Sequence, residues 1–325
     1  MDNFKVFSGS SGRIFAEKIC KYMDITLGES TVRNFSDGNT FVRIEEPVRG
    51  KDVYLIQSIG LNPNNEFVEL LFWLDAFKRA SANSVTAIVP YFGYAKGDKK
   101  DEPRVSIRAR VCAECIELSG ADRIVTMDLH SPQVQGFFRK PVDNLSGMPL
   151  LSEYIKMLKL DDYVIVSPDA GFAKQARAFA NYLNVTVVIG DKRRTDHTEN
   201  PEILELIGDV RGKDAVIVDD FVISGGTLIN LADMLKQQGA NRIFACVSHI
   251  LLNTEGIEKI NKSCLEMIIS TDTVFCPALI KSEKIQCISA APLFAESILR
   301  IQNCQSISSL FSALPPKLFE ASLSI

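Results

Sequence analysis

The stretch Asp214–Ala240, DAVIVDDFVISGGTLINLADMLKQQGA, decides the fold class predicted for this chain. Ala215–Val218 is a short apolar run, the form expected of a strand that is buried on both faces. The helix predicted from about Leu228 repeats its apolar residues at close to the 3.6-residue period. A strand, a glycine-containing loop and a helix in this order indicate an α/β fold, in which ligands bind beyond the carboxyl ends of the strands.

Polar and small residues separate this strand from its helix. The acidic pair at the strand end is Asp219 and Asp220, and the loop is formed by Ser224, Gly225, Gly226 and Thr227. Such a loop can close its N–H groups around an anion at the positive end of a helix, and carboxylates can accept hydrogen bonds from vicinal hydroxyls. The pattern predicts a sugar-phosphate pocket. An ordinary turn beside a solvated acidic corner is the alternative, and the spacing is not that of a Walker A loop.

Length and composition favour an α/β protein with more than one domain. The 325 residues suffice for two domains, and no apolar run approaches the roughly 20 residues of a membrane helix. The N-terminus lacks the features of a signal peptide, and a formal charge of −4 gives no general attraction to nucleic acid. Eight scattered cysteines, mostly inside apolar runs, indicate buried free thiols in a reducing cytoplasm. Cys112 and Cys115 form a CxxC on a predicted helix, without a second ligand pair for zinc.

Apolar runs alternate with helical patterns along nearly the whole chain, which predicts parallel α/β sheets. A faint repeat relates the segment from Asp52 to the segment from Asp214, so we expect two similar α/β halves. The predicted domains are residues 1–147 and 148–311, followed by a tail at 312–325 in which Pro315 and Pro316 stop any helix. Turn residues at 36–39 between two short runs predict a hairpin, or flag, near 31–44.

Three further polar stretches follow predicted strands. Asp128 and His130 lie two residues apart, Asp169 precedes a glycine turn, and the basic stretch from Gly190 opens a polar loop. Each alone also fits a satisfied histidine, a capped helix or a solvated charge run. Together, at strand ends, they favour phosphoryl or phosphoribosyl chemistry on a sugar phosphate.

At this point the chain resembles the ribose-phosphate diphosphokinase (PRPP synthetase) family over about residues 4–311. The resemblance is carried by NFSDGNTFVRIEEPVRGKDVYLIQS (34–58), DAFKRASA (75–82), VPYFGYAKGDKK (89–100), TMDLHSPQVQGFFRKPVDNL (126–145), VSPDAG (166–171), DKRR (191–194), VDDFVISGGT (218–227) and SISSLF (306–311). Several long motifs in one order make this resemblance specific.

The resemblance implies two phosphoribosyltransferase-like domains and the conversion of ATP and ribose 5-phosphate into PRPP and AMP. It also implies Mg²⁺ and a homo-oligomer built from dimers, for which we expect a hexamer, with the flag of one subunit completing the ATP site of its neighbour. It assigns catalysis to Lys192 and Arg194; ATP binding to Phe35, Asp37, Asn39, Lys96, Gly97 and His130; ribose 5-phosphate binding to Asp169, Asp219, Asp220, Ser224, Gly225, Gly226 and Thr227; and magnesium to His130, Asp169, Asp128 and Asp143. Because magnesium prefers oxygen ligands, Asp169 is its more natural ligand and His130 fits a water-mediated contact.

Several positions depart from the family pattern. The family usually has Glu at Asn39, Arg-Gln at Lys96-Gly97, Arg at Gln175 and an acidic residue at Ile223. A lysine keeps a point charge but lacks the planar fork of arginine. These changes motivate the alternative of a catalytically weak paralogue that regulates an active partner. A phosphoribosyltransferase that consumes PRPP is the third hypothesis, which the flag and the DKRR stretch disfavour.

Overall fold

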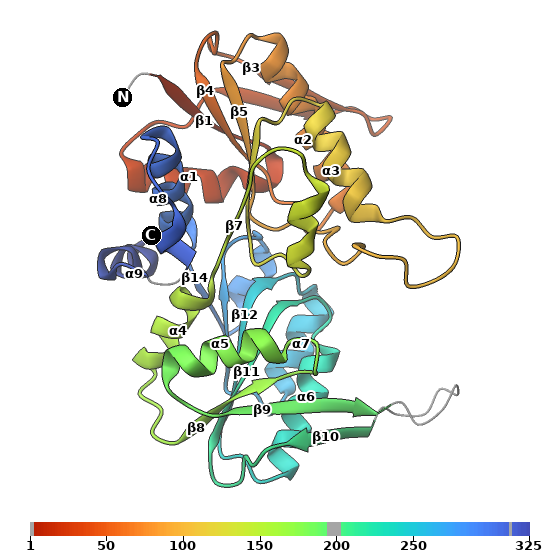
Figure 1. Cartoon of the computed structure of the whole chain (residues 1–325), viewed down its shortest axis with the longest axis vertical. Coiled ribbons are helices and arrows are strands. Elements are labelled where there is room, and N and C mark those ends of the chain that lie inside the picture. Colours follow the sequence, from red (N-terminus) through yellow and green to blue (C-terminus); the bar gives the residue numbers. More distant parts are fainter. Residues whose placement is uncertain (1–2, 194–202, 312–313) are drawn as a thin grey trace. The chain divides into compact units, whose positions relative to one another are not determined.

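The computed structural model describes residues 3–193, 203–311 and 314–325, which form two compact units (Figure 1). The first unit contains Met1–Ser146, Asp272–Phe275 and Ser289–Ile325, and the second contains Gly147–Thr271 and Cys276–Ile288. Each unit is built around its own parallel sheet, so the predicted α/β class is confirmed.

The sheet of the first unit is entirely parallel, with the strand order β1-β4-β5-β6-β7. These strands are β1 (Phe4–Ser8), β4 (Asp52–Ile56), β5 (Ser84–Val89), β6 (Arg123–Met127) and β7 (Val142–Leu145). The helices of this unit are α1 (Arg13–Met23), α2 (Pro63–Arg79), α3 (Arg108–Leu118), α8 (Ala291–Gln302) and α9 (Pro316–Ser324). Short 3₁₀ segments, such as η1 (Ser10–Gly12) before α1, complete the connections.

Alternation along the strands of the first unit places two sets of apolar side chains on opposite faces. One set, including Val53 and Leu55, joins a core cluster with α2 and α3, in which Trp73 stacks on Phe77 with ring centroids 5.7 Å apart. The intervening residues, such as Ile56, are also fully buried. Because both faces are covered, the strands read as the continuous apolar runs from which they were predicted.

A two-stranded hairpin formed by β2 (Ser30–Asn34) and β3 (Thr40–Ile44) stands apart from this sheet and is antiparallel. Its turn is closed by the Phe35 amide, which donates to the Asn39 carbonyl (2.8 Å), and by Gly38 at φ +89°. A positive φ suits glycine, which has no Cβ to clash. The predicted flag near 31–44 is therefore confirmed as a hairpin.

The second unit has a larger sheet in the order β10-β9-β8-β11-β12-β13-β14, parallel except for the β9–β10 pair. Its strands are β8 (Tyr163–Ser167), β9 (Val187–Arg193), β10 (Ile203–Ile207), β11 (Asp214–Val222), β12 (Ile243–Ile250), β13 (Met267–Thr271) and β14 (Ile285–Ile288). Its helices are α4 (Met148–Met157), α5 (Ala173–Leu183), α6 (Gly226–Gln237) and α7 (Thr254–Lys262). The opening stretch forms β11 in the middle of this sheet, followed by α6.

The internal repeat has matching backbone contacts in both units. In β4–α2–β5 the Asn83 amide donates to the Lys51 carbonyl, and in β11–α6–β12 the Asn241 amide donates to the Lys213 carbonyl, each at 2.8 Å. The Gly50 amide donates to Ser81 in the first unit, as the Gly212 amide does to Gly239 in the second. The repeated sequence thus encodes the same strand–helix–strand turn twice.

The C-terminal end differs from the predicted arrangement. Residues from Ser289 onward belong to the first unit rather than to the second, and the residues after Pro315 form α9, with Pro316 as its first residue. The prediction that the two prolines stop any helix there was wrong, because proline is well tolerated at the first helical position, where its missing N–H costs nothing. Leu318 is buried, and the Ser289 amide donates to the Ser322 carbonyl (3.1 Å).

All eight cysteines are free, but the prediction of buried thiols holds only in part, because Cys287 and Cys304 are exposed. Cys112 lies on α3, where burial raises the pKa of its thiol to about 12. In the described part of the chain, no helix combines the length and the apolar character needed to cross a membrane.

Candidate active site

The loop after β11 has the form of an anion site. Gly225, at φ +78°, is the residue before α6, whose first turn contains Gly226 and Thr227. The first N–H groups of a helix have no intrahelical acceptor, and they lie at the positive end of the helix dipole. Ile223 is 49% exposed in this loop and contributes no charge. The backbone of the loop therefore supplies the donors that a phosphate needs.

Gly225 can be tested by a matched pair of substitutions. We expect Gly225→Ala and Gly212→Ala each to lower the free energy of unfolding by about 1 kcal/mol, because both glycines have positive φ. A Cβ at Gly225 would also lie 3.2 Å from Ile260 Cδ1, whereas one at Gly212 meets nothing within 4 Å. Only Gly225→Ala should therefore lower affinity for ribose 5-phosphate, about tenfold by calorimetric titration. Equal affinities in the two variants would contradict this role of the loop.

The acidic pair lies at the carboxyl end of β11. Asp219 Oδ1 accepts the Asp220 amide and Asp220 Oδ1 accepts the Phe221 amide, both at 2.9 Å. Asp220 is buried, and burial together with the charges of Asp220 and Asp169 raises the pKa of Asp219 well above its usual range. Closely spaced carboxylates resist simultaneous ionisation, so this edge of the sheet favours a ligand that brings donors or positive charge.

Asp169 belongs to the same edge. It follows β8, the neighbour of β11, and its Oδ1 accepts the Phe172 amide (3.1 Å) just before α5. Its charge adds to the causes that raise the pKa of Asp219, after burial and Asp220. The structure thus brings together the residues assigned to ribose 5-phosphate from the sequence: Asp169, Asp219, Asp220, Ser224, Gly225, Gly226 and Thr227.

The two assigned catalytic cations lie on the next strand and beyond it. Lys192 belongs to β9, where it pairs with Leu204 of β10, and Arg194 lies outside the described residues. A Cβ at Gly190, two residues before Lys192, would meet the Pro168 carbonyl oxygen at 3.0 Å. The backbone of β9 therefore passes close to the loop that carries Asp169.

In the first unit, Asp128 and His130 follow β6. Asp128 has φ +41°, unusual for a residue other than glycine, and its amide donates to the Leu145 carbonyl (3.0 Å). The Leu129 amide donates to Asn144 Oδ1 (3.1 Å), a contact that was not anticipated from the sequence. Left-handed conformations of residues other than glycine are strained, and they concentrate at functional sites.

Asp143, assigned to the same metal site, makes a different contact. Its Oδ2 lies 2.5 Å from Arg123 Nη1, at the first residue of β6, whereas Asp128 follows the last residue of that strand. The structure therefore does not bring Asp143 together with Asp128. Among the described residues, no cluster of three or more His, Cys, Asp or Glu side chains is arranged to hold a metal ion.

Apart from His130, the residues assigned to ATP occupy the flag and the loop after β5. Phe35 is 55% exposed, and both Asp37 oxygens accept hydrogen bonds from Asn39, at 3.0 Å each. These bonds lower the pKa of Asp37, and the bond from the Asn39 backbone amide has the largest effect. A Cβ at Gly97 would lie 2.8 Å from Arg108 Nε. Gly97 thus leaves room for the Arg108 side chain beside the exposed Lys96.

The loop that carries Lys96 is tied to the His130 segment by a contact that was not anticipated from the sequence. Asp98, two residues after Lys96, accepts a hydrogen bond from Ser131 Oγ. Asp98 was visible in the sequence as the acidic residue of GDKK, but its partner Ser131 lies 33 residues away, so the contact could not be predicted.

Comparisons with known proteins agree on one family. Residues 4–120 match the model of the N-terminal domain of ribose phosphate pyrophosphokinase, and residues 197–312 match that of the phosphoribosyl synthetase-associated domain. The chain is 43% identical to a ribose-phosphate pyrophosphokinase of Campylobacter jejuni, over 96% of this chain and 100% of the relative. The chain belongs to the ribose-phosphate pyrophosphokinase family. A relative of that name from Caldanaerobacter subterraneus is 45% identical, over 96% of this chain and 98% of the relative.

A solved structure supports the same membership at the level of the fold. The crystal structure of phosphoribosylpyrophosphate synthetase from Mycobacterium smegmatis matches with a TM-score of 0.88 and 33% identity, covering 93% of this chain and 100% of that one. The resemblance found in the sequence is therefore confirmed. Gln175 stands where the family pattern has arginine, and its buried Oε1 accepts no hydrogen bond from the described residues.

The raised pKa of Asp219 predicts a pH-dependent stability. A carboxyl whose pKa is higher in the folded than in the unfolded state stabilises the fold while it is protonated, and that contribution falls as the pH rises above about 4, the ordinary pKa of aspartate. Asp219→Asn cannot ionise, so its melting temperature should exceed that of the unsubstituted protein by several degrees more at pH 9 than at pH 5. Differential scanning calorimetry measures this, with Asp233→Asn as the control for the substitution; an equal difference at both pH values would contradict it.

Proposed function

We propose that this chain transfers the β,γ-diphosphoryl group of ATP to the 1-hydroxyl of ribose 5-phosphate, giving PRPP and AMP. The observation that carries the proposal is the acidic pair Asp219 and Asp220 near the carboxyl end of β11, two residues before the loop that leads into the N-terminus of α6. A furanose phosphate presents vicinal hydroxyls and one dianion. The carboxylates accept from the hydroxyls, and the loop amides donate to the phosphate.

In the proposed reaction, the 1-hydroxyl oxygen forms a bond to the β-phosphorus while the bond from that phosphorus to the oxygen bridging to the α-phosphate breaks. The hydroxyl proton is released, and the bridging oxygen leaves on AMP. Phosphoryl-type transfer depends mostly on positioning and on neutralising charge. We assign Lys192 and Arg194 to stabilising the charge on the transferred group, and His130 and Lys96 to ATP.

The acidic residues of the second unit fit a magnesium ion that is bound partly by the protein and partly by substrate phosphates, rather than by protein ligands alone. Asp169, Asp219 and Asp220 offer only oxygen donors, which magnesium prefers, and their mutual repulsion favours a cation. We propose that Asp169 holds it together with substrate phosphates, since magnesium usually binds through one or two carboxylates and phosphate oxygens. When bound, the ion neutralises part of the charge on the ATP phosphates. His130 is proposed to contact it through water.

We extend the proposal to the assembly and the location. The exposed flag residues Phe35, Asp37 and Asn39 are proposed to complete the ATP site of a neighbouring subunit, in a homo-oligomer built from dimers, with six subunits as the expected size. Exposed aromatic side chains such as Phe35 are typical of interface contacts. The eight free cysteines suit a reducing cytoplasm, where we propose the reaction takes place.

Positional labelling tests the reaction directly. The protein is incubated with Mg²⁺, ribose 5-phosphate and ATP that carries the label either at the α- or at the γ-phosphorus. Diphosphoryl transfer places the γ label in PRPP and the α label in AMP. A γ label in a sugar bisphosphate, with ADP as the second product, would show single-phosphoryl transfer and contradict the proposal.

A further inference from the structure

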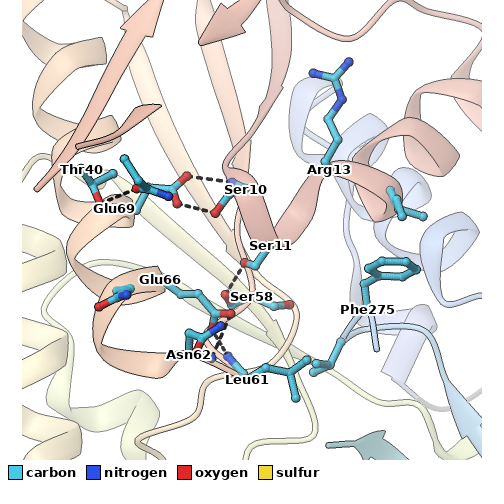
Figure 2. A pocket seen from close by; sticks show the side chains of 15 residues that line it. Ser10, Ser11, Arg13, Thr40, Ser58, Leu61, Asn62, Glu66, Glu69 and Phe275 are labelled. Carbon is cyan, nitrogen blue, oxygen red and sulfur yellow. Dashed lines mark hydrogen bonds between the residues drawn. The ribbon is translucent and has the colours of Figure 1, made fainter. Parts of the chain in front are cut away.

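A cavity of about 480 Å³ lies in the first unit, outside every residue assigned so far (Figure 2). Its walls come from the β1–α1 connection, the start of α1, the flag strands, the β4–α2 connection, the first half of α2 and the segment Val274–Phe275. This volume lies in the range of sites for small organic ligands.

The strand order separates this cavity from the Asp128–His130 segment. The connections that line it follow β1 and β4, whereas Asp128 follows β6, and β5 lies between β4 and β6. Neighbouring strands are about 4.8 Å apart, so the two positions differ by roughly 10 Å across the sheet. The cavity is therefore separate from the Asp128–His130 segment. Its flag residues Asn34 and Thr40 adjoin Phe35 and Asn39 in sequence but are not themselves among the residues assigned to ATP.

Two buried glutamates of α2 line the cavity, and one of them is committed to the fold. Glu69 Oε1 accepts the Ser10 amide (2.7 Å) and Trp73 Nε1 (3.2 Å), and Glu69 Oε2 accepts the Ser10 hydroxyl. These contacts anchor the β1–α1 connection to α2. Glu69 therefore acts as a structural carboxylate.

The carboxylate of Glu66 can accept further hydrogen bonds from a ligand. Its Oε2 accepts the Gly60 amide (2.5 Å) and its Oε1 accepts the Asn62 amide (3.2 Å). A carboxylate oxygen can accept more than one hydrogen bond, so one donor on each oxygen leaves room for others. Burial, reinforced by the nearby charge of Glu69, raises the pKa of Glu66. A positively charged donor in the cavity would offset the cost of ionising the buried Glu66 carboxyl.

Apolar side chains from distant parts of the sequence meet at the same cavity. Ile14, Leu61 and Phe275 line it and are 38%, 41% and 43% exposed. Figure 2 shows Leu61 and Phe275 beside the cavity that Glu66 also lines. The nearby cation Arg13 is already paired with Glu17 (2.6 Å). An apolar wall beside a buried carboxylate selects for a ligand that is both flat and cationic.

We propose that this cavity binds a small planar organic cation. Its amidine- or guanidine-type head donates hydrogen bonds to Glu66, and its flat apolar body packs against Phe275 and Leu61. The site is independent of the proposed diphosphoryl transfer, because it shares no residue with that chemistry.

Benzamidine is the probe, titrated into the full-length protein by calorimetry. We expect saturable one-to-one binding with a dissociation constant at or below about 1 mM, within the affinity open to a ligand of this size. Benzamide, which is neutral and of the same shape, should bind at least tenfold more weakly. Glu66→Gln should weaken benzamidine binding at least tenfold, since hydrogen bonds to charged groups are the strong ones, and Phe275→Ala about fivefold. Glu114→Gln, on α3 and outside the cavity, is the matched control and should bind normally.

Two further measurements keep the test decisive. Glu66 accepts hydrogen bonds from the Gly60 and Asn62 amides, so Glu66→Gln can unfold the protein. In that case Leu61→Asn, a substitution of an exposed side chain, tests the same cavity. Asp220→Asn should leave benzamidine binding unchanged, which separates this site from the proposed catalytic one. Absent saturable binding, equal binding of benzamide, or indifference to both Glu66→Gln and Phe275→Ala would overturn the proposal. A third outcome would also overturn the proposal: the protein does not bind benzamidine, and Phe275→Ala dissociates an oligomer. That result would assign this face to contact with a second copy of the chain.

Discussion

Asp220→Asn is expected to raise the dissociation constant for ribose 5-phosphate about 100-fold while changing that for ATP less than threefold. Asp220 is buried at the end of β11, and its Oδ1 already accepts the Phe221 amide. A buried carboxylate that also accepts from ribose hydroxyls contributes about 1.5–3 kcal/mol for each bond, and a 100-fold change corresponds to about 2.7 kcal/mol. Asparagine keeps one acceptor but turns a donor toward the hydroxyls.

Calorimetric titrations with each substrate alone measure both constants. Asp209→Asn is the matched control, because the exposed Asp209 also accepts a backbone amide, that of Arg211 at 3.1 Å. The control should leave both affinities unchanged. Equal losses for ATP and ribose 5-phosphate in Asp220→Asn would count against the assigned role of the acidic pair.

Lys192→Ala should lower kcat about 1000-fold and change the KM values for ATP and ribose 5-phosphate less than threefold. A cation aimed at charge that develops on transferred phosphates acts mainly in the transition state, where one such contact contributes 10²–10³ in rate and more in a water-excluded site. Lys192 lies on β9, close in sequence to Gly190, which approaches the Asp169 loop. This position suits a residue that acts on substrates proposed to bind at the ends of β8 and β11.

Steady-state kinetics with both substrates varied give these constants. Lys213→Ala is the control, since Lys213 lies just before β11 and its Nζ is 4.0 Å from Asp162 Oδ1. That variant should retain full turnover. A rise in KM with kcat preserved in Lys192→Ala would show that this lysine only binds ground-state substrate.

Much of the fold follows from local signals in the sequence. Fully buried parallel strands read as short apolar runs, so β4, β5 and β8 could be located closely. In contrast, β11 and β12 continue to Val222 and Ile250, through polar residues at which the apolar runs end. The glycines and the acidic pair marked the loop before α6, because a positive φ at Gly225 and an anion-binding helix N-terminus need those residue types.

Other elements depend on contacts that the sequence does not display. β7 contains polar residues, including Asp143, and is held by pairing with β6 and by the Arg123 ion pair. α9 begins at a proline that was read as a terminator, and it is anchored by the buried Leu318 and by the bond from Ser289. Its assignment to the first unit required knowledge of long-range packing.

The candidate sites show the same division. The residues proposed to bind ribose 5-phosphate lie at or just after the carboxyl ends of neighbouring strands, so the rule for parallel sheets brings them to one edge. Asp143 belonged to the same motif as Asp128, yet its carboxylate pairs with Arg123 instead. The cavity at Glu66 was not predicted, because its walls are drawn from distant segments, and no motif links Ser10, Glu66 and Phe275.

The central claim is that this chain is itself an active diphosphokinase rather than a regulatory paralogue. Its most direct test is the formation of AMP and PRPP by the purified chain, supplied with Mg²⁺, ATP and ribose 5-phosphate and free of any homologous chain. We expect equimolar AMP and PRPP, at a turnover on the order of 1 s⁻¹ or faster. AMP formation no greater than that of Lys192→Ala would contradict it, and co-purification with an active homologue would then support the regulatory alternative.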